Sequence, residues 1–414
     1  MSSRTNLSGA DAAPAEDLRP AVTVLVGFAP KASHAVARAL LVADPTLILI
    51  RHDVSSMPHG QIQRVVRTGA ALLEDVTVEL AHSCIGCALR EDLLPALIRL
   101  SLEHPGRDMV LLLPQAVDPE ALAAACVDHP VNQAVRFDSY VAVADAVTML
   151  DDLTSTDDLR HRGLHTAGND DRGVAEVLVR QIEYADTVLL WADPDVDTFE
   201  LARAAALLHR LAPWATQLRA GGAASVDCTA LAAALRDCHR HDPQVPGMLG
   251  RAMEGFSIGV HEPNADCGVV SMLFQARRPF HPQRLHDALG AVAGEALRGR
   301  GQCWVASQPD GIVGWESAGG GTALGTLGYW LAALPAHRWE EATNLRRLAA
   351  GLAWDPYYGD RGTSLAFVGL HLDVAVISET LRACLLTDAE LALGFNGWRD
   401  LPDPFADCFP LFED

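Results

Sequence analysis

The chain has 414 residues, of which 49% are hydrophobic and 21% are charged, and its formal net charge is −21. This composition supports well-packed cores in more than one domain and excludes a largely disordered chain. The acidic excess excludes broad, non-specific binding to nucleic acids or anionic membranes, because both need a basic surface. We therefore expect neither a membrane nor sequence-specific DNA as a partner, although a local arginine patch remains compatible with RNA contact.

Residues 1–20 are polar and rich in Ala and Asp, and we expect them to form a disordered tail. They lack the apolar centre of a signal peptide, and no apolar run in the chain is long enough to cross a bilayer. The nine cysteines, an odd number, are spread along the chain. These features predict a cytoplasmic protein with reduced thiols.

From residue 21 onwards, apolar strand patterns alternate with helical patterns, which favours parallel pairing through right-handed crossovers. We therefore expect a three-layer α/β domain with a mostly parallel sheet over residues 21–235. The polar segment 154–173 is expected to be an exposed loop. Strands are predicted at 21–27, 46–53, 76–83, 108–116, 137–150 and 184–194, and helices at 33–44, 60–74, 89–104 and 119–129.

Residues 236–260 contain Pro and Gly without a clear period, as is typical of a linker. The patterns beyond this segment predict a smaller α+β domain over residues 261–414. Its strands are predicted at 268–278, at 302–325 as strand, turn and strand, and at 364–374, and its helices at 281–297 and 377–391.

The first predicted strand and helix have the setting of a phosphate-binding loop, G-x-x-x-x-G-K-[ST]. Gly27 takes the first position, but Ala32, Ser33 and His34 stand where the motif has Gly, Lys and Ser/Thr. Lys31, the only lysine of the chain, is two positions early. Ser33 has at best one hydrogen bond to donate, and His34 is a poor ligand for Mg²⁺. The clamp for β- and γ-phosphates is therefore missing.

Cys84 and Cys87 form a C-x-x-C turn between the third predicted strand and its helix. Near the helix N-terminus, the Cys87 thiolate would be stabilised. Two thiolates at this spacing chelate a cation such as Zn²⁺ but supply only half of a tetrahedral site. We expect His82 to point to the other face of the strand. The alternatives are a redox pair or two inert thiols. The further candidate ligands are Glu79, His52 and Asp53.

Two other clusters of metal-ligating residue types occur. The segment 237–244 contains Cys238, His239 and His241, but it is typical of a helix end entering a linker. His161 and His165 belong to the predicted loop 154–173. We interpret both clusters as structural or solvated.

Together these features resemble the CobW-like family of zinc-linked P-loop GTPases and metallochaperones. SCIGCALREDLL (83–94) is similar to the family string G-C-I-C-C-T-x-R-x-D-L-L, and QIEYADTVLLWADPD (181–195) is similar to the segment leading to its guanine-reading N-K-x-D. The resemblance implies a P-loop GTPase-like domain, a smaller CobW C-terminal-like domain, and Zn²⁺ as a ligand.

Three further strings resemble one divergent branch of this family, the Mrf-type proteins. They are ARRPFHPQRLH (276–286), WESAGGG (315–321) and DPFADC (403–408). This resemblance implies a role in zinc starvation, in which the protein recruits a hibernation-promoting factor to the small ribosomal subunit.

The sequence departs from the family pattern at sites that matter for chemistry. Gly86 stands where the family has its middle cysteine, so one thiolate ligand is missing. Residues 191–194, Trp-Ala-Asp-Pro, replace N-K-x-D, which puts Asp193 one position early. The strand at 108–116 lacks the expected Glu and Gly. Because phosphoryl transfer depends on positioned charge, we expect binding of GTP and Mg²⁺ to be weak and hydrolysis to be weak or absent.

The sequence therefore leaves three functions open. The first is the recruitment role implied by the resemblance, and the alternative is a zinc metallochaperone that delivers or senses Zn²⁺ through Cys84 and Cys87. The third is a residual GTPase. No catalytic residue is predicted. The vestigial nucleotide-binding residues are Gly27, Lys31, Ser33, His34 and Asp193.

Overall fold

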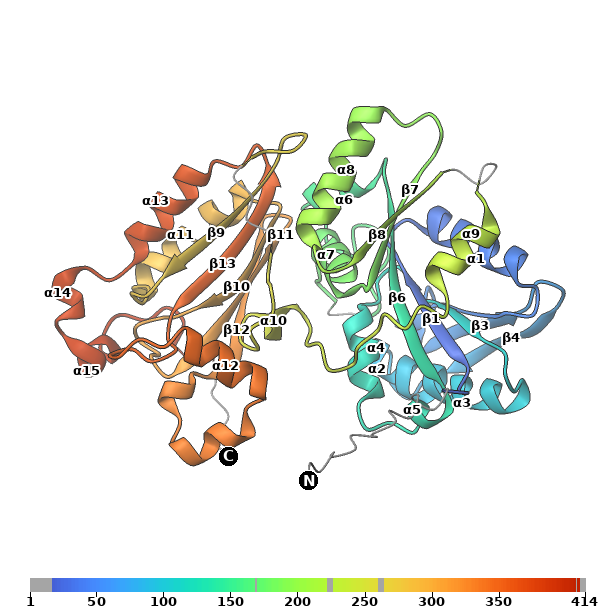
Figure 1. Ribbon diagram of the computed structural model, residues 1–414, viewed down its shortest axis with the longest axis horizontal. Helices are drawn as coiled ribbons and strands as arrows, with labels where there is room; N and C mark the ends of the chain where they lie inside the picture. Colours follow the sequence, from blue (N-terminus) through green and yellow to red (C-terminus); the bar gives the residue numbers. More distant parts are fainter. Residues whose placement is uncertain (1–16, 168–169, 222–225, 260–263, 407, 410–414) are drawn as a thin grey trace, which may run out of the picture.

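The computed structural model describes residues 17–167, 170–221, 226–259, 264–406 and 408–409, so most of the predicted tail lies outside the described residues. Two layered units lie side by side (Figure 1), one built on an eight-stranded sheet and the other on a five-stranded sheet. Among the described helices, none is both long and apolar enough to cross a bilayer.

The first sheet has the strand order β4-β3-β2-β5-β1-β6-β7-β8. Six neighbouring strands of this sheet, β2-β5-β1-β6-β7-β8, pair in parallel. The other two, β3 and β4, are antiparallel and lie at one edge. This confirms the predicted mostly parallel sheet. The strands are β1 (Ala21–Val26), β2 (Ile48–Asp53), β3 (Gln61–Arg67), β4 (Leu72–Glu79), β5 (Met109–Leu112), β6 (Arg136–Asp145), β7 (Thr187–Ala192) and β8 (Thr216–Gly221).

Helices cover both faces of this sheet, which explains why β1 is apolar along its whole length. Val22, Val24 and Val26 belong to one core and Leu25 to the other. The second core lies under α1 (Pro30–Ala43) and α9 (Cys228–Leu235). The first lies under α3 (Leu94–Glu103), α4 (Pro119–Cys126), α5 (Val131–Ala134), α6 (Met149–Thr154), α7 (Val174–Tyr184) and α8 (Thr198–Leu211).

The helix predicted at 60–74 is wrong, because this segment forms β3 and the start of β4 (Figure 1). Ile62, Val65 and Val66 have the i, i+3, i+4 spacing of a helix, which misled the prediction. In the structure Ile62 and Val66 are buried on one strand face. Gly69 turns the chain against Pro45, whose Cα would lie 2.9 Å from a Cβ at this position.

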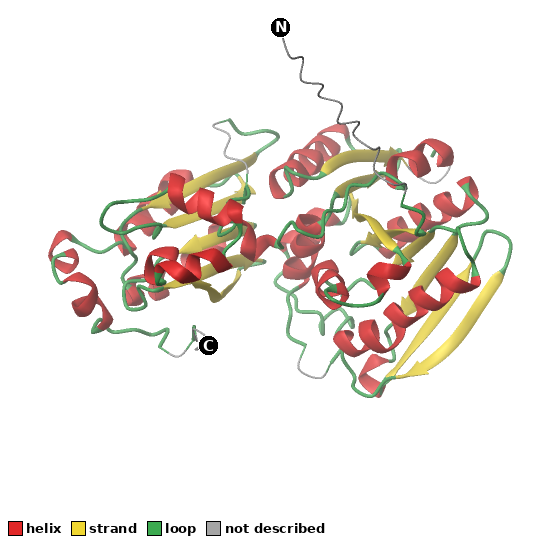
Figure 2. Ribbon diagram, turned by 60° about the horizontal axis from the view of Figure 1, so that its bottom comes forward, coloured by secondary structure: helices red, strands yellow, loops and turns green. Residues whose placement is uncertain are grey.

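The second sheet is antiparallel, in the order β12-β11-β10-β13-β9, with α11 and α13 packed on one face (Figure 2). The predicted α+β class is thus confirmed, but the segment 302–325 belongs to three strands rather than two. The elements are β9 (Val269–Ala276), α11 (Pro282–Glu295), β10 (Arg298–Cys303), β11 (Gly311–Ala318), β12 (Gly321–Tyr329), α12 (Asn344–Leu352), β13 (Thr363–Leu370), α13 (Val374–Cys384), α14 (Asp388–Leu391) and α15 (Gly394–Arg399), after a short α10 (Met248–Arg251).

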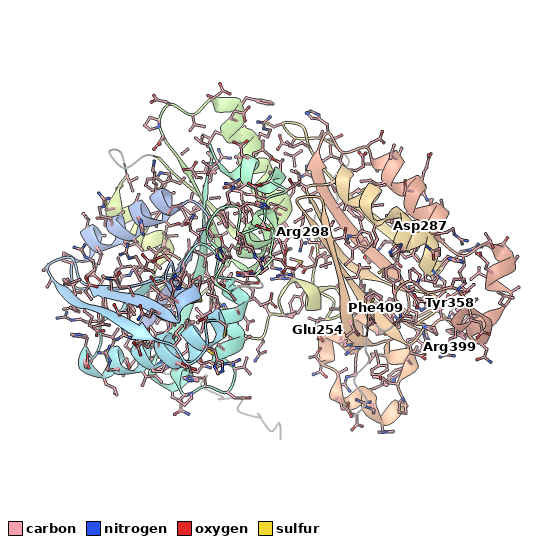
Figure 3. The ribbon with its side chains drawn as sticks, turned by 180° about the vertical axis from the view of Figure 1, so that it is seen from behind. Glu254, Asp287, Arg298, Tyr358, Arg399 and Phe409 are labelled. Atoms are coloured by element: carbon pink, nitrogen blue, oxygen red, sulfur yellow. The ribbon has the colours of Figure 1, made fainter. Side chains whose placement is uncertain are left out.

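A buried charge cluster joins the two units. Glu183 on α7 accepts two 2.8 Å hydrogen bonds from Arg298 on β10 and a further one from Arg300. Arg298 also binds Glu316 at 2.8 Å, and Glu316 binds Arg180 on α7. The side chains of Glu183, Arg298 and Arg300 are each at most 2% exposed. Figure 3 shows Arg298 where the units meet.

Removing the Glu183 charge should destabilise the protein. In Glu183→Gln two guanidinium groups lose their main counter-ion inside the protein, and we expect the free energy of unfolding to fall by about 3–5 kcal/mol. The matched control is Glu103→Gln, which removes an exposed i,i+4 pair with Arg99 and should cost less than about 0.5 kcal/mol. Chemical denaturation measures both, and equal losses would contradict the role given to Glu183.

Candidate functional site

Three potential metal ligands meet where β4 is followed by a helix. The ligand atoms of His82, Cys87 and Glu91 all lie within 4.8 Å of one another. In the described part of the chain, no other three His, Cys, Asp or Glu side chains come this close. His82 and Glu91 are exposed and Cys87 is half-buried, so an ion there would be accessible from solvent.

The local fold brings these residues together. Cys84 caps the short helix α2 (Ile85–Cys87), and its Sγ accepts a hydrogen bond from the Cys87 backbone N–H at 3.3 Å. The chain continues into a π-helical turn, η2 (Ala88–Leu93), which carries Glu91 four residues after Cys87. The Glu91 carboxylate accepts a 3.2 Å bond from the backbone N–H of Ala81, which fixes it beside the bend that carries His82.

The expected position of His82 was wrong. The prediction assumed that a strand continued to residue 83, but β4 ends at Glu79 and residues 81–84 form bends. Strand alternation therefore does not govern His82. Glu91 was missed, although its position in the first turn of the predicted helix, four residues after Cys87, was a usable signal.

Cys84 lies beside this group but outside it. Its Sγ is also 3.9 Å from the place that a Cβ on Gly86 would occupy, an ordinary contact distance. A side chain at residue 86 therefore has room, and sterics do not explain the missing middle cysteine.

The charge state of Cys87 also differs from the expectation. The hydrogen bond with Cys84, together with desolvation and the nearby Glu91, raises the pKa of Cys87 to about 11. These effects outweigh any stabilisation of the thiolate by the N-terminus of the helix that runs on from α2 through η2. At neutral pH Cys87 is a neutral thiol, so a metal that binds it must displace a proton.

Asp92 anchors the helix that carries the site. Its carboxylate, 5% exposed, accepts hydrogen bonds from His52 Nε2 at 2.7 Å and from Arg64. Burial opposes the charged form, but these two partners outweigh burial and lower the pKa of Asp92. His52 therefore holds Asp92 rather than a metal. The candidate Asp53 accepts a 2.9 Å bond from the Ser55 N–H, and Glu79 is outside the ligand group.

The connection from β1 to α1 is shorter than a phosphate-binding loop. Helix α1 begins at Pro30, three residues before the predicted start, so only residues 27–29 separate strand and helix. Ser33 and His34 are inside the helix, and Lys31 is exposed on its first turn. Gly27 has a packing reason to be glycine, since a Cβ there would lie 2.5 Å from the Val143 carbonyl oxygen.

A cavity of about 250 Å³ lies at the N-terminus of α1. Gly27, Ser33 and His34 line it together with His52 and His165, but Asp193 does not. Asp193 is instead exposed in the loop after β7. The structure thus brings three of the five predicted nucleotide-binding residues together and leaves Lys31 and Asp193 outside.

The remaining clusters have structural roles. Cys238 donates its backbone N–H and its thiol to Asp138, at 3.1 and 3.5 Å, and burial raises the pKa of this thiol. His241 contacts Asp186 at 3.3 Å. Exposed His161 contacts Asp158 at 3.0 Å.

Comparison with known proteins gives consistent matches along the chain. Residues 49–220 match the model of the CobW/HypB/UreG nucleotide-binding domain, and residues 269–385 match that of the cobalamin synthesis protein cobW C-terminal domain. The chain is 33% identical over 384 residues to "Zinc chaperone Rv0106" of Mycobacterium tuberculosis, covering 90% of this chain and 89% of that protein.

Two more distant similarities complete the comparison. The chain is 28% identical over 393 residues to "Zinc-regulated GTPase metalloprotein activator 1" of Dictyostelium discoideum, covering 92% of this chain and 81% of that protein. Among solved structures, the Zn(II)-bound YjiA GTPase from E. coli aligns with 89% of this chain and 99% of its own at 14% identity, with a TM-score of 0.35.

The ligand assignment makes a specific prediction about zinc content. Purified reduced protein should bind about one Zn²⁺ per chain, with affinity that falls as pH is lowered because the thiols protonate. His82→Ala should weaken binding about tenfold or more, and the double variant Cys84→Ser/Cys87→Ser should lose it. Elemental analysis and competition with a chelator of known affinity measure these effects.

The matched controls are Cys238→Ser and His286→Ala, which change a cysteine and an exposed histidine outside the turn. Both should keep the zinc. Zinc retained by the double variant, or lost by Cys238→Ser, would mean that the ligands lie elsewhere.

Proposed function

The chain belongs to the CobW-like family of zinc-linked GTPases, and from this membership we propose that it is a zinc chaperone. The observation that carries the proposal is the approach of His82, Cys87 and Glu91 to within 4.8 Å, with Cys84 beside them. The zinc-linked names of the two relatives support the same function. Zinc is here the cargo of the protein.

The four candidate ligands, His82, Cys84, Cys87 and Glu91, have the chemistry to bind zinc and the exposure to release it to another protein. Two thiolates, an imidazole and a carboxylate supply four ligands of the kinds that Zn²⁺ takes in tetrahedral sites, whereas Mg²⁺ takes oxygen ligands. Because two of the three clustered side chains are exposed, an acceptor protein can reach the ion directly. The raised pKa of Cys87 favours release, since a proton competes with the metal for the thiol.

We further propose that transfer proceeds without GTP hydrolysis. Three features support this: the connection of only residues 27–29, the exposed position of Lys31, and the absence of Asp193 from the cavity. The match to the nucleotide-binding model also begins at residue 49, after this connection and α1. A site without its lysine and its metal ligand lacks the positioned charges that stabilise phosphoryl transfer.

A transfer assay tests the chaperone function. The zinc-loaded chain is mixed with a metal-free zinc enzyme in a buffer whose chelator suppresses free Zn²⁺, and recovery of the enzyme's activity is followed. The wild-type chain should activate the enzyme faster than the chelator–zinc buffer alone, and Cys84→Ser/Cys87→Ser should not. Activation that is no faster than the buffer would contradict delivery.

The second candidate is recruitment of a hibernation-promoting factor to the small ribosomal subunit. A GTPase-like body without its catalytic groups favours it, because such a body still serves as a scaffold. The string 315–321, part of the resemblance behind this candidate, has a packing role: Trp315 is buried, and a Cβ on Gly319 would lie 2.4 Å from the Ser155 carbonyl oxygen. Co-sedimentation with small subunits and the factor, with and without zinc, tests it, and a chain that stays in the supernatant contradicts it.

The nucleotide site yields a separate prediction. We expect GTP to bind more weakly than about 10 μM and to show no Mg²⁺-dependent turnover above background, with Lys31→Ala behaving like the wild type. Calorimetry and a phosphate-release assay measure the two quantities. Sub-micromolar affinity that requires Mg²⁺, or hydrolysis that disappears in Lys31→Ala, would show that the short connection rearranges into a working loop.

A further inference from the structure

A groove with an unusual charge runs between α1 and the β2–β3 pair, next to the cavity at the helix N-terminus. It has a volume of about 470 Å³. Three arginines, Arg38, Arg51 and Arg67, line it, and no carboxylate does. Its remaining walls are mainly aliphatic: Ala37, Leu41, Val42, Leu49, Val65 and Leu112.

These arginines lack the partners that most arginines of this chain have. Within the described residues, the side chains of Arg38 and Arg51 make no hydrogen bond or ion pair, and that of Arg67 reaches only the carbonyl of its neighbour Thr68, at 3.4 Å. After the hydrogen bonds with Ser55, the charge of Arg51 also contributes to the lowered pKa of Asp53, a carboxylate outside the groove. In a chain with a net charge of −21, carboxylates are plentiful, and pairs such as Arg64 with Glu74 on the adjacent strands show the ordinary outcome. Arg38 and Arg67 are exposed and Arg51 is half-buried, so the three like charges stay solvated and give the groove a positive potential that favours an anion.

The fold brings the three arginines to one groove from two sides. Arg51 on β2 is paired with Val65 on β3, and Leu49 is paired with Arg67. Arg51 and Arg67 are therefore diagonal neighbours on one face of the β2–β3 pair. Arg38 faces them from α1. The pKa of His34 is lowered, first by burial and then by the charges of Arg51 and Arg38, so both guanidinium groups act at the same imidazole.

The groove is continuous with the cavity at the start of α1, because His34, Arg51 and Leu112 line both. Three buried polar atoms of residues that line that cavity have no hydrogen-bond partner: Ser33 Oγ, His52 Nδ1 and His165 Nδ1. Ser33 and His52 are 3% and 6% exposed. A helix N-terminus with an unsatisfied buried hydroxyl is a favourable place for an oxygen of an anionic ligand.

We propose that this groove binds an organic diphosphate, with its phosphates on Arg38, Arg51 and Arg67 and its organic part on the aliphatic wall. A diphosphate monoester carries roughly three negative charges near neutral pH, which matches three guanidinium groups. The binding needs no Mg²⁺, since no carboxylate in the groove holds the ion. The site is independent of the zinc turn and does not rest on the chaperone function.

Titration calorimetry of the full chain in EDTA tests the proposal. The probes are inorganic pyrophosphate, GDP and geranyl diphosphate, which separate the shared diphosphate from a nucleoside or an isoprenoid body. We expect one pyrophosphate per chain and tighter binding of one of the two organic diphosphates. Arg38→Gln and Arg67→Gln should each weaken binding about tenfold or more, since a charge-assisted hydrogen bond is lost.

Arg382→Gln is the matched control, because Arg382 is an exposed arginine on α13, in the other unit. It should leave diphosphate binding unchanged, and all three variants should keep the zinc content of the wild type. Equal weakening by Arg382→Gln would reduce the effect to non-specific charge, and no binding of any probe at millimolar concentration would overturn the proposal. Binding of a 20-nucleotide RNA but of none of the diphosphates would identify an RNA surface instead and would also overturn it.

Discussion

The carboxylate of Glu183 holds the two units of this protein together. It comes from α7 of the first unit and neutralises two arginines of β10 in the second, all of them out of contact with water. A buried guanidinium group without a carboxylate is costly, so the position of the second sheet in which Arg298 and Arg300 reach Glu183 on α7 is favoured. Neither the C-x-x-C turn nor the arginine groove contributes a residue to this cluster.

Asp92 applies the same principle within the first unit. By pairing with His52 on β2 and Arg64 on β3, it fixes the helical segment that carries Cys87 and Glu91 to the sheet. The ligands themselves remain outside this buried pair, on an exposed bend and a short helix. A buried anchor beneath solvent-facing ligands is suited to a metal that is bound and then passed on.

Much of the fold was predictable, because strand and helix periods alternate clearly from residue 21 onwards and both sheets follow from them. The hairpin of β3 and β4 was not, since Ile62, Val65 and Val66 fit a helical period as well and only pairing with β2 decides between them. The sequence pointed to the C-x-x-C turn but misplaced His82, because the end of a strand at Glu79 has no local signal. The arginine groove was not predictable at all, since Arg38, Arg51 and Arg67 meet only through the tertiary fold.

The proposed function depends on zinc binding to the turn through mixed sulfur and nitrogen or oxygen ligands. X-ray absorption at the zinc edge measures this directly on the loaded full-length chain. We predict about two sulfur neighbours at about 2.3 Å and about two lighter neighbours at about 2.0–2.1 Å, with the sulfur shell absent from Cys84→Ser/Cys87→Ser. A wild-type spectrum without sulfur neighbours, or one unchanged in that variant, would contradict it.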